Sequence, residues 1–303
     1  MRLFGFLLLV VTIMMNMALA NGFVVPVRLA KYISIPIIRL NINGDSTQFM
    51  FDSGSQSALH LPLHFLQQLP QATQQANDDL SLDMSGNLTK SSKFMIQHLN
   101  INGLDFDNVK AVELKPWGFS YSSDPSVVAP TPEDGLPVIG LTLFKNHILT
   151  LDFAHNKLQV DNHNQSVPYD DKWIAVPYRY HVKEGLIIGV TDGNNHYNLV
   201  LDSGASVSMI VGKSLPEKYQ NSNILTKADH GDAHIRLKKN GAAQTIKIYP
   251  DYPLIGKLPV RAVIIDGTPK DFEADGLLGM DFLQKYMVRI DQKNNKLWIK
   301  PAK

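Results

Sequence analysis

A short motif occurs twice in this chain, once in each half, and it constrains the fold more than any other feature. Asp52-Ser53-Gly54 follows the apolar residues 49–51, and Asp202-Ser203-Gly204 follows the apolar residues 199–201. A carboxylate at the end of a buried strand is costly unless something compensates it. Two such carboxylates, one in each half, predict that the halves face each other and that the acids share a proton.

The surroundings of the motif repeat as well. A single Asp-Ser/Thr-Gly occurs by chance in roughly one chain in ten of this length, so one copy would be weak evidence. Val138-Ile139-Gly140 and Leu277-Leu278-Gly279, however, lie 139 residues apart, and the same offset takes Asp152 to Asp291 without a gap. We therefore interpret the chain as a diverged tandem duplication.

Both halves predict the same order of elements. In the first half, a strand over 33–42 and a turn at 43–45 precede the strand 48–51 that ends at Asp52. In the second half, a strand over 186–190 and a turn at 192–195 precede the strand 197–201 that ends at Asp202. Short helices are expected at 62–68, 141–145, 212–219 and 281–285. The predicted fold class is all-β with a few short helices.

The N-terminus has the pattern of a secretion signal. Arg2 precedes a mostly apolar run over 3–17, and Ala18-Leu19-Ala20 fits a cleavage site. A retained membrane anchor is the alternative, but the run is shorter than the roughly 20 residues of a spanning helix. We expect a signal peptide over 1–20, a first lobe over 21–163 and a second lobe over 167–303.

The amino-acid composition limits where the protein is expected to reside in or outside the cell and what it is expected to bind. The chain has no cysteine and a formal net charge of +1. It therefore has no disulfide framework or thiol nucleophile, and no broad nucleic-acid surface is indicated. An exported chain without disulfides is typical of a bacterial periplasmic or secreted protein, and we expect no membrane contact after signal cleavage.

The middle of the two halves differs in length. The Asp-Ser-Gly motifs are 150 residues apart and the downstream motifs 139, so the first half carries 11 extra residues between them. The segment 115–121, with the Ser/Pro-rich run to residue 137, is the expected place. Trp117, Phe119 and Tyr121 are candidates to line a substrate cleft, and an aromatic plug on the core of their own lobe is the alternative.

Two adjacent carboxyl groups suit hydrolysis by an activated water. Like charges a few ångströms apart do not both ionise easily, so one acid stays protonated while the other acts as a base. Gly54 and Gly204 allow backbone N–H groups to approach the carboxylates. Ser53 and Ser203 offer hydroxyls that can bond across the junction of the halves. Ser55 could bond Asp52, or make a local turn bond instead, whereas Ala205 has no hydroxyl.

These motifs resemble those of the pepsin and retropepsin superfamily of aspartic peptidases, most closely bacterial retropepsin-like proteins with two fused copies. The resemblance covers nearly the whole chain after residue 20. It implies β-rich lobes with a cleft between them, Asp52 and Asp202 as the catalytic pair, no metal and no cofactor. It also implies that the segments ending at Gly140 and Gly279 pass through the loops that carry the catalytic triplets.

The chain departs from this family in two respects. Serine replaces the commoner threonine in both triplets, which loses a stiffening methyl group. The candidate flap over 82–88, with Ser85 and Gly86 as cleft candidates, lacks the tyrosine of pepsin-like flaps. Retropepsin flaps lack that tyrosine too, so this difference favours a resemblance to the retropepsins over the pepsin-like enzymes.

Other constellations favour structural roles. His60 and His64, like His230 and His234, are four residues apart, a spacing that binds zinc on a helix. Pro62 and Gly231 interrupt these pairs and neither has an adjacent glutamate, so we predict no metal site. Asp152 and Asp291 each precede a polar turn and are expected to cap it.

The sequence therefore predicts a two-lobed, monomeric aspartic endopeptidase that acts on polypeptides. Two alternatives remain: an inactive peptide-binding or protease-inhibiting protein on the same fold, and a lobe that pairs with a lobe of another chain.

Overall fold

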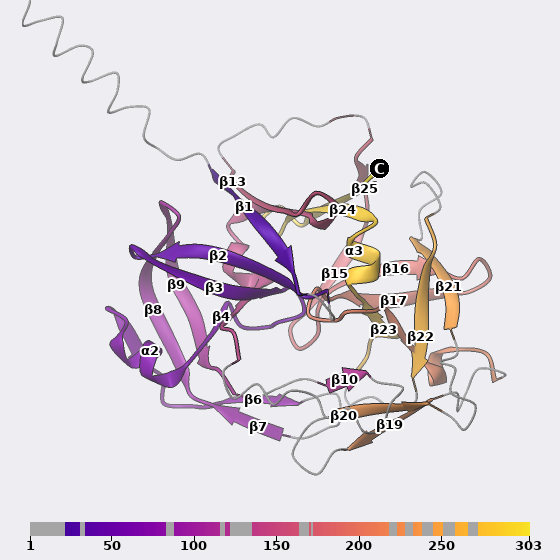
Figure 1. Cartoon of the computed structure of the whole chain (residues 1–303), viewed down its shortest axis with the longest axis horizontal. Helices are drawn as coiled ribbons and strands as arrows, with labels where there is room; N and C mark the ends of the chain where they lie inside the picture. The colour runs from indigo at the N-terminus through magenta and orange to yellow at the C-terminus, as the bar shows by residue number, and fades with distance from the viewer. Residues whose placement is uncertain are drawn as a thin grey trace, which may run out of the picture.

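Figure 1 shows the computed structural model of the chain, in which β-strands make up most of the regular structure. The predicted all-β class with few short helices is confirmed. The structure describes the following residues: 22–30, 34–82, 88–115, 119–121, 135–163, 170, 172–217, 223–227, 233–237, 245–250, 258–265 and 272–303. The predicted signal peptide over 1–20 lies outside these ranges, and so do Ser85, Gly86 and Trp117.

The largest sheet has thirteen strands and contains strands from both halves. In spatial order they are β14 (Ile174–Ala175), β25 (Lys296–Pro301), β24 (Tyr286–Asp291), β12 (His147–Asp152), β13 (Lys157–Asn162), β1 (Gly22–Leu29), β2 (Pro36–Ile42), β3 (Asp45–Asp52), β11 (Val138–Gly140), β4 (Leu59–Leu61), β9 (Leu104–Glu113), β8 (Lys93–Ile101) and β5 (Ala72–Gln74).

The second half contributes a separate seven-stranded sheet. Its order is β15 (Tyr178–His181), β16 (Gly185–Thr191), β17 (His196–Leu201), β23 (Gly276–Leu278), β18 (Met209–Val211), β22 (Val260–Ile265) and β21 (Thr245–Pro250).

Two smaller sheets complete the described strands. β6 (Asp79–Leu82) and β7 (Leu88–Ser91) form a hairpin, while β10 (Phe119–Tyr121), β20 (Ala233–Leu237) and β19 (Asn223–Lys227) form a three-stranded sheet. In Figure 1 both lie on the opposite side of the molecule from β13 and β24.

The two halves join through their matching hairpins. β12 and β24 pair antiparallel from Ile148 opposite Asp291 to Leu151 opposite Val288. The hairpins β12–β13 and β24–β25 have bounds that differ by 139 residues at both ends, as the ungapped sequence repeat predicts. β4 and β18 are likewise equivalent, because their bounds differ by 150 residues.

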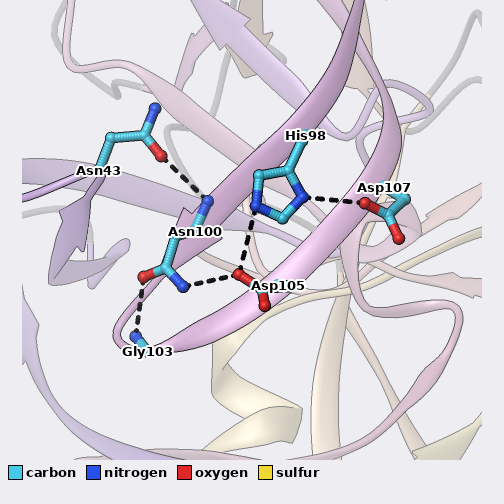
Figure 2. Close-up of polar contacts among 6 residues, drawn as sticks. All are labelled: Asn43, His98, Asn100, Gly103, Asp105 and Asp107. Carbon is cyan, nitrogen blue, oxygen red and sulfur yellow. Dashed lines mark hydrogen bonds and ion pairs between the residues drawn. The ribbon is translucent and has the colours of Figure 1, made fainter.

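Asn-Gly turns fix the register of the hairpins in the first half. Asn43 and Gly44 both have positive φ, 51° and 102°, which is the geometry of a two-residue turn between twisted strands. Asn102 and Gly103 repeat this geometry between β8 and β9. At this end of the hairpin Asn100 donates its side-chain amide to Asp105 at 2.7 Å and accepts the N–H of Gly103 (Figure 2).

Solvent-facing groups line the same hairpin. Figure 2 shows His98 on β8 between Asp105 and Asp107 on β9, with ring nitrogens 3.4 Å and 3.0 Å from their carboxylates. The hydrogen bond with Asp107 raises the pKa of His98. Exposed pairs of this kind add little stability because water and salt screen them.

Short helices occur where the sequence predicts them, with one difference in length. α2 (Leu63–Gln68) follows Asp52, and η1 (Leu141–Phe144) and α3 (Met280–Leu283) follow Gly140 and Gly279. The helix predicted over 212–219 is interrupted, because η3 (Gly212–Ser214) ends before Leu215, and residues 218–219 lie outside the described residues. Leu215 is extended, with φ −104° and ψ 160°, because the ring of Pro216 disfavours a helical residue before it.

One apolar core extends through both halves. The alternating strand β2 places Ile38, Leu40 and Ile42 in it. Phe51 packs against both Phe144 and Phe153, with ring centroids 6.3 Å apart in each pair. Burial of each such side chain stabilises the fold by about 2 kcal/mol. In the described part of the chain, no helix combines the length and the apolar character needed to cross a bilayer.

We expect Thr150→Val to weaken the junction of the halves. Thr150 is buried on β12, and its hydroxyl accepts a hydrogen bond from the Nε of Arg289 on β24 at 3.2 Å. Removing the acceptor of a buried charged donor should lower the free energy of unfolding by about 1.5–3 kcal/mol. Urea unfolding measures this change, and Thr73→Val on the exposed strand β5 is the control. Equal midpoints for the two variants would contradict the prediction.

Candidate active site

The two Asp-Ser-Gly loops meet at the centre of the molecule. Asp52 ends β3, where it lies beside Gly140 of β11. Asp202 follows β17 and donates its backbone N–H to the carbonyl of Leu278 on β23. The carboxyl groups of Asp52 and Asp202 are hydrogen-bonded to each other. The structure therefore brings together the two residues that the sequence singled out.

Ser53 and Ser203 tie the loops together reciprocally. The Ser53 hydroxyl donates to the carbonyl of Leu201 at 2.8 Å and accepts the N–H of Ser203 at 2.9 Å. The Ser203 hydroxyl donates to the carbonyl of Phe51 and accepts the N–H of Ser53, both at 2.9 Å. Both serines are at most 1% exposed, so the four bonds are shielded from water. They hold the two carboxyl groups in register.

The two glycines of the motif give space to the opposite carboxyl group. A Cβ on Gly54 would lie 2.7 Å from the Cγ of Asp202, and one on Gly204 would lie 2.9 Å from the Cγ of Asp52. Each glycine also donates its N–H to the aspartate of its own loop, at 2.9 Å for Gly54 and 2.8 Å for Gly204. The glycines thus allow close approach and supply donors to the carboxylates.

The two carboxyl groups differ in proton affinity. Burial, the charge of Asp52 and the hydrogen bond with Asp52 hold the pKa of Asp202 well above its ordinary value. Burial also raises the pKa of Asp52, but the bond from Asp202 and backbone N–H groups of Gly54, Gly204 and Ser55 oppose that rise. The pair therefore shares one proton, and the directions of the two pKa values favour Asp202 as the group that holds it.

Gly140 and Gly279 occupy equivalent tight positions behind the loops. A Cβ on Gly140 would lie 2.1 Å from the carbonyl oxygen of Ser57, and one on Gly279 would lie 2.5 Å from the carbonyl carbon of Val207. No side chain fits at such distances from backbone atoms. The segments β11 and β23 therefore support the two Asp-Ser-Gly loops only if they end in glycine.

The Ser55 hydroxyl makes the local bond that the sequence analysis weighed as its alternative. It lies 3.1 Å from the carbonyl oxygen of Ser57 and 2.8 Å from Nε2 of His60. The contact with the Asp52 carboxylate comes from the backbone N–H of Ser55. In the sequence His60 stood out only as a possible zinc ligand, and no pattern pointed to this bond.

The second half supports its loop through different residues. The N–H and hydroxyl of Ser208 both donate to one oxygen of Asp281, at 2.8 Å and 2.7 Å. The Ser208 hydroxyl in turn accepts the N–H of Gly279 at 3.0 Å. Burial raises the pKa of Asp281, and these donors oppose the rise. The only sequence signal was an aspartate two residues after Gly279, too common a pattern to single out.

The predicted cleft residues are placed only in part. Ser85 and Gly86 lie between the described strands β6 and β7, and together with Trp117 they fall outside the described residues. The backbone of Phe119 and Tyr121 forms β10, which pairs in parallel with β20 of the second half. Their role in a cleft stays a prediction.

The remaining polar candidates cap turns, as predicted. Asp152 accepts the N–H of His155 at 3.2 Å, and Asp291 accepts the N–H of Asn294 at 3.0 Å. Within the described residues no cluster of three or more His, Asp or Glu side chains is arranged to hold a metal ion. The pair His230 and His234 lies outside the residues whose side chains are described.

Solved structures with the same architecture identify the fold. An aspartic proteinase from Irpex lacteus superposes with a TM-score of 0.54 at 12% sequence identity, covering 92% of this chain and 97% of that one. This chain has a pepsin-like fold. Basic 7S globulin from soybean also matches, with a TM-score of 0.53 at 8% identity over 93% of this chain and 95% of that one. No protein-family model and no curated protein sequence matches the chain.

The pepsin-like fold does not decide the activity by itself. One neighbour is named as a proteinase and the other as a globulin, and both identities are too low to transfer a function. The chemistry of the paired aspartates must therefore carry the functional argument.

We expect Ser53→Ala to destabilise the protein strongly. The change removes two buried bonds and leaves the carbonyl of Leu201 and the N–H of Ser203 without these partners. The free energy of unfolding should fall by about 2–4 kcal/mol in urea titrations. Ser46→Ala, on the exposed start of β3, should leave it unchanged. An equal effect of the two changes would rule out the reciprocal serine bonds.

The stability of the protein should fall on acidification because of His60. Burial lowers the pKa of His60 from 6.5 to about 4, so the unfolded chain binds the proton first as the pH falls. Stability is then fully present above about pH 6.5 and declines towards pH 4, by at most about 3 kcal/mol. His60→Gln should remove this part of the decline in urea unfolding measured at several pH values. Parallel profiles for the variant and the wild type would contradict it.

Proposed function

We propose that this protein is an aspartic endopeptidase that hydrolyses peptide bonds with a water activated by Asp52 and Asp202. One observation supports the proposal above the others: the carboxyl groups of Asp52 and Asp202 face each other, each packed against the glycine of the opposite loop, and share a hydrogen bond. A pair of this kind combines a general base and a general acid in one place.

The division of labour follows from the proton affinities. Ionised Asp52 takes a proton from the water as its oxygen attacks the carbonyl carbon, and protonated Asp202 donates a hydrogen bond to the carbonyl oxygen as negative charge develops there. Asp52 then gives its proton to the leaving nitrogen as the C–N bond breaks. Asp202 keeps its proton at the end of the cycle. The step needs no covalent intermediate and no other reactant.

The substrate would be an extended polypeptide. We propose that two lobes, residues 21–163 and 167–303, form a cleft that opens on the side away from β13 and β24, where the hairpin β6–β7 and the sheet β10–β20–β19 lie. Ser85, Gly86, Trp117, Phe119 and Tyr121 are proposed to border it. A monomer suffices for this cleft, because both aspartates come from one chain.

We also propose that the protein is exported from a bacterial cell, into the periplasm or the medium, after removal of residues 1–20. The pattern of Arg2, the apolar run and Ala18-Leu19-Ala20 supports this, together with the absence of cysteine from the chain.

A peptide-binding or protease-inhibiting protein is the second candidate. The match with a globulin of the same fold favours it, because the fold alone does not require catalysis. Retention of both Asp-Ser-Gly triplets, with the shared proton, favours the enzyme.

We expect Asp52→Asn and Asp202→Asn each to abolish cleavage while leaving the fold intact. Either change removes one of the two proton-transfer groups, so kcat/KM should fall by at least about 10²-fold. Mass spectrometry of an unfolded protein substrate, incubated between pH 4 and 7 with each variant, measures the loss. Wild-type kcat/KM should fall on the acid side as Asp52 becomes protonated and on the alkaline side as Asp202 ionises.

Binding of the same substrate separates the two candidate functions. If wild type and Asp52→Asn bind a peptide equally and neither cleaves it, the protein is a binding protein and the enzyme proposal is wrong.

A further inference from the structure

His60 occupies a position where the equivalent residue of the second half is a buried aliphatic. β4 and β18 are equivalent strands offset by 150 residues, and His60 corresponds to Ile210, which is fully buried. Ser55 corresponds in the same way to Ala205. The first half thus has a hydroxyl and an imidazole where the second half has only methyl and aliphatic groups.

The Ser55 hydroxyl is held on two sides. It donates to the carbonyl of Ser57 at 3.1 Å, and because a hydroxyl has one hydrogen, its oxygen is then left to accept from His60 at 2.8 Å. The tautomer of His60 with its proton on Nε2 satisfies both contacts. Gly140 packs against the same hydroxyl, since a Cβ there would lie 3.1 Å from it. The side chain of Ser55 therefore has one arrangement.

This arrangement reaches Asp52 through the backbone. The N–H of Ser55 donates to the Asp52 carboxylate, and it also lies 3.2 Å from the carbonyl oxygen of Asp52. A donor to the carboxylate stabilises its ionised form. If the Ser55 side chain loses its anchor, the N–H is less well held and the Asp52 carboxylate loses part of this support.

We propose that His60 is a positioning residue for Asp52, which it orders by holding the hydroxyl of Ser55. This proposal rests on the proposed peptidase function and adds a residue to its machinery. His60 does not touch substrate and takes no proton from it.

Charged groups around His60 belong to three elements. Asp79 on β6 acts on His60 electrostatically and is itself paired with Lys93 on β8 at 3.2 Å. From β9, Glu113 lies opposite Leu61, the neighbour of His60, and is ion-paired with Lys115. Burial outweighs the attraction of Asp79, so the pKa of His60 is lowered to about 4 and the imidazole is neutral at higher pH.

The test replaces residues that support the first Asp-Ser-Gly loop by the residues found at the equivalent positions of the second half. His60→Ile replaces the imidazole that contacts Ser55 by the isoleucine found at the equivalent position 210. Ser55→Ala removes the hydroxyl itself. Each change should lower kcat about tenfold at pH 5 on a peptide substrate, with KM changed less than twofold, because a loosened donor misplaces the base. The acid limb of the kcat/KM profile should move to higher pH, because Asp52 is then easier to protonate.

Coupling between the two changes distinguishes positioning from packing. If His60 acts through Ser55, the double variant should be no slower than either single variant. His60→Gln, whose amide can donate to the hydroxyl, should recover part of kcat. His64→Gln, on the exposed face of α2 four residues away, should match the wild type. The proposal would be overturned if the losses of kcat in the two single variants added up in the double variant. It would also be overturned if His60→Ile kept the wild-type kcat and the wild-type acid limb of the kcat/KM profile. If His60→Ile does not fold, Ser55→Ala carries the same test.

A measurement without substrate separates this proposal from the proposed function. Carboxyl ¹³C NMR titration, assigned with Asp52→Asn, follows Asp52 directly in the wild type and in Ser55→Ala. A higher Asp52 pKa in the variant supports the positioning role even if the wild type cleaves nothing, and an unchanged pKa refutes it even if the wild type is an active peptidase.

Discussion

The contact between two carboxyl groups, of which Asp52 is buried and Asp202 half-buried, is the constraint on which the rest of this structure depends. Two carboxylates in hydrogen-bond contact cannot both be charged without a large electrostatic cost, so they share a proton. The shared proton requires close approach, and close approach requires glycine at positions 54 and 204, where any Cβ would meet the opposite carboxyl group. The serines between aspartate and glycine then hold the geometry through four shielded bonds.

The duplication explains why the two aspartate loops have the same geometry, but it does not explain why the two aspartates differ in proton affinity. Equivalent strands and hairpins recur at fixed offsets, and the two loops make reciprocal bonds through Ser53 and Ser203. The support behind them has diverged: His60 contacts Ser55 in the first half, and Asp281 contacts Ser208 in the second. An acid and a base need different proton affinities, so different surroundings for two like residues are what hydrolysis by this pair demands.

The supports are themselves ionisable, which links the site to pH beyond the dyad. His60 is kept neutral by burial, and Asp281 holds its three hydrogen-bond donors as an acceptor. Protonation of His60 keeps its Nε2–H donor but places a charge in a site that disfavours it, and protonation of Asp281 weakens the acceptor for the two Ser208 donors. We therefore expect the loss of stability at low pH to depend on His60 and Asp281, which support the loops, as well as on the two aspartates.

The sequence by itself determined the repeat, the fold class and the two aspartates, because short-range patterns fix them: Asp-Ser-Gly after an apolar strand, Asn43-Gly44 in a hairpin turn and an ungapped offset between downstream motifs. The helix predicted over 212–219 is interrupted at Leu215, where Pro216 favours an extended backbone. Only the tertiary structure decided the partners of the Ser55 hydroxyl, the proton on Asp202 and the pairing of β10 with β20. The last two depend on burial and on contacts between residues far apart in the chain, which no local pattern records. The partners of the Ser55 hydroxyl depend on how the loop after Gly54 folds back towards His60.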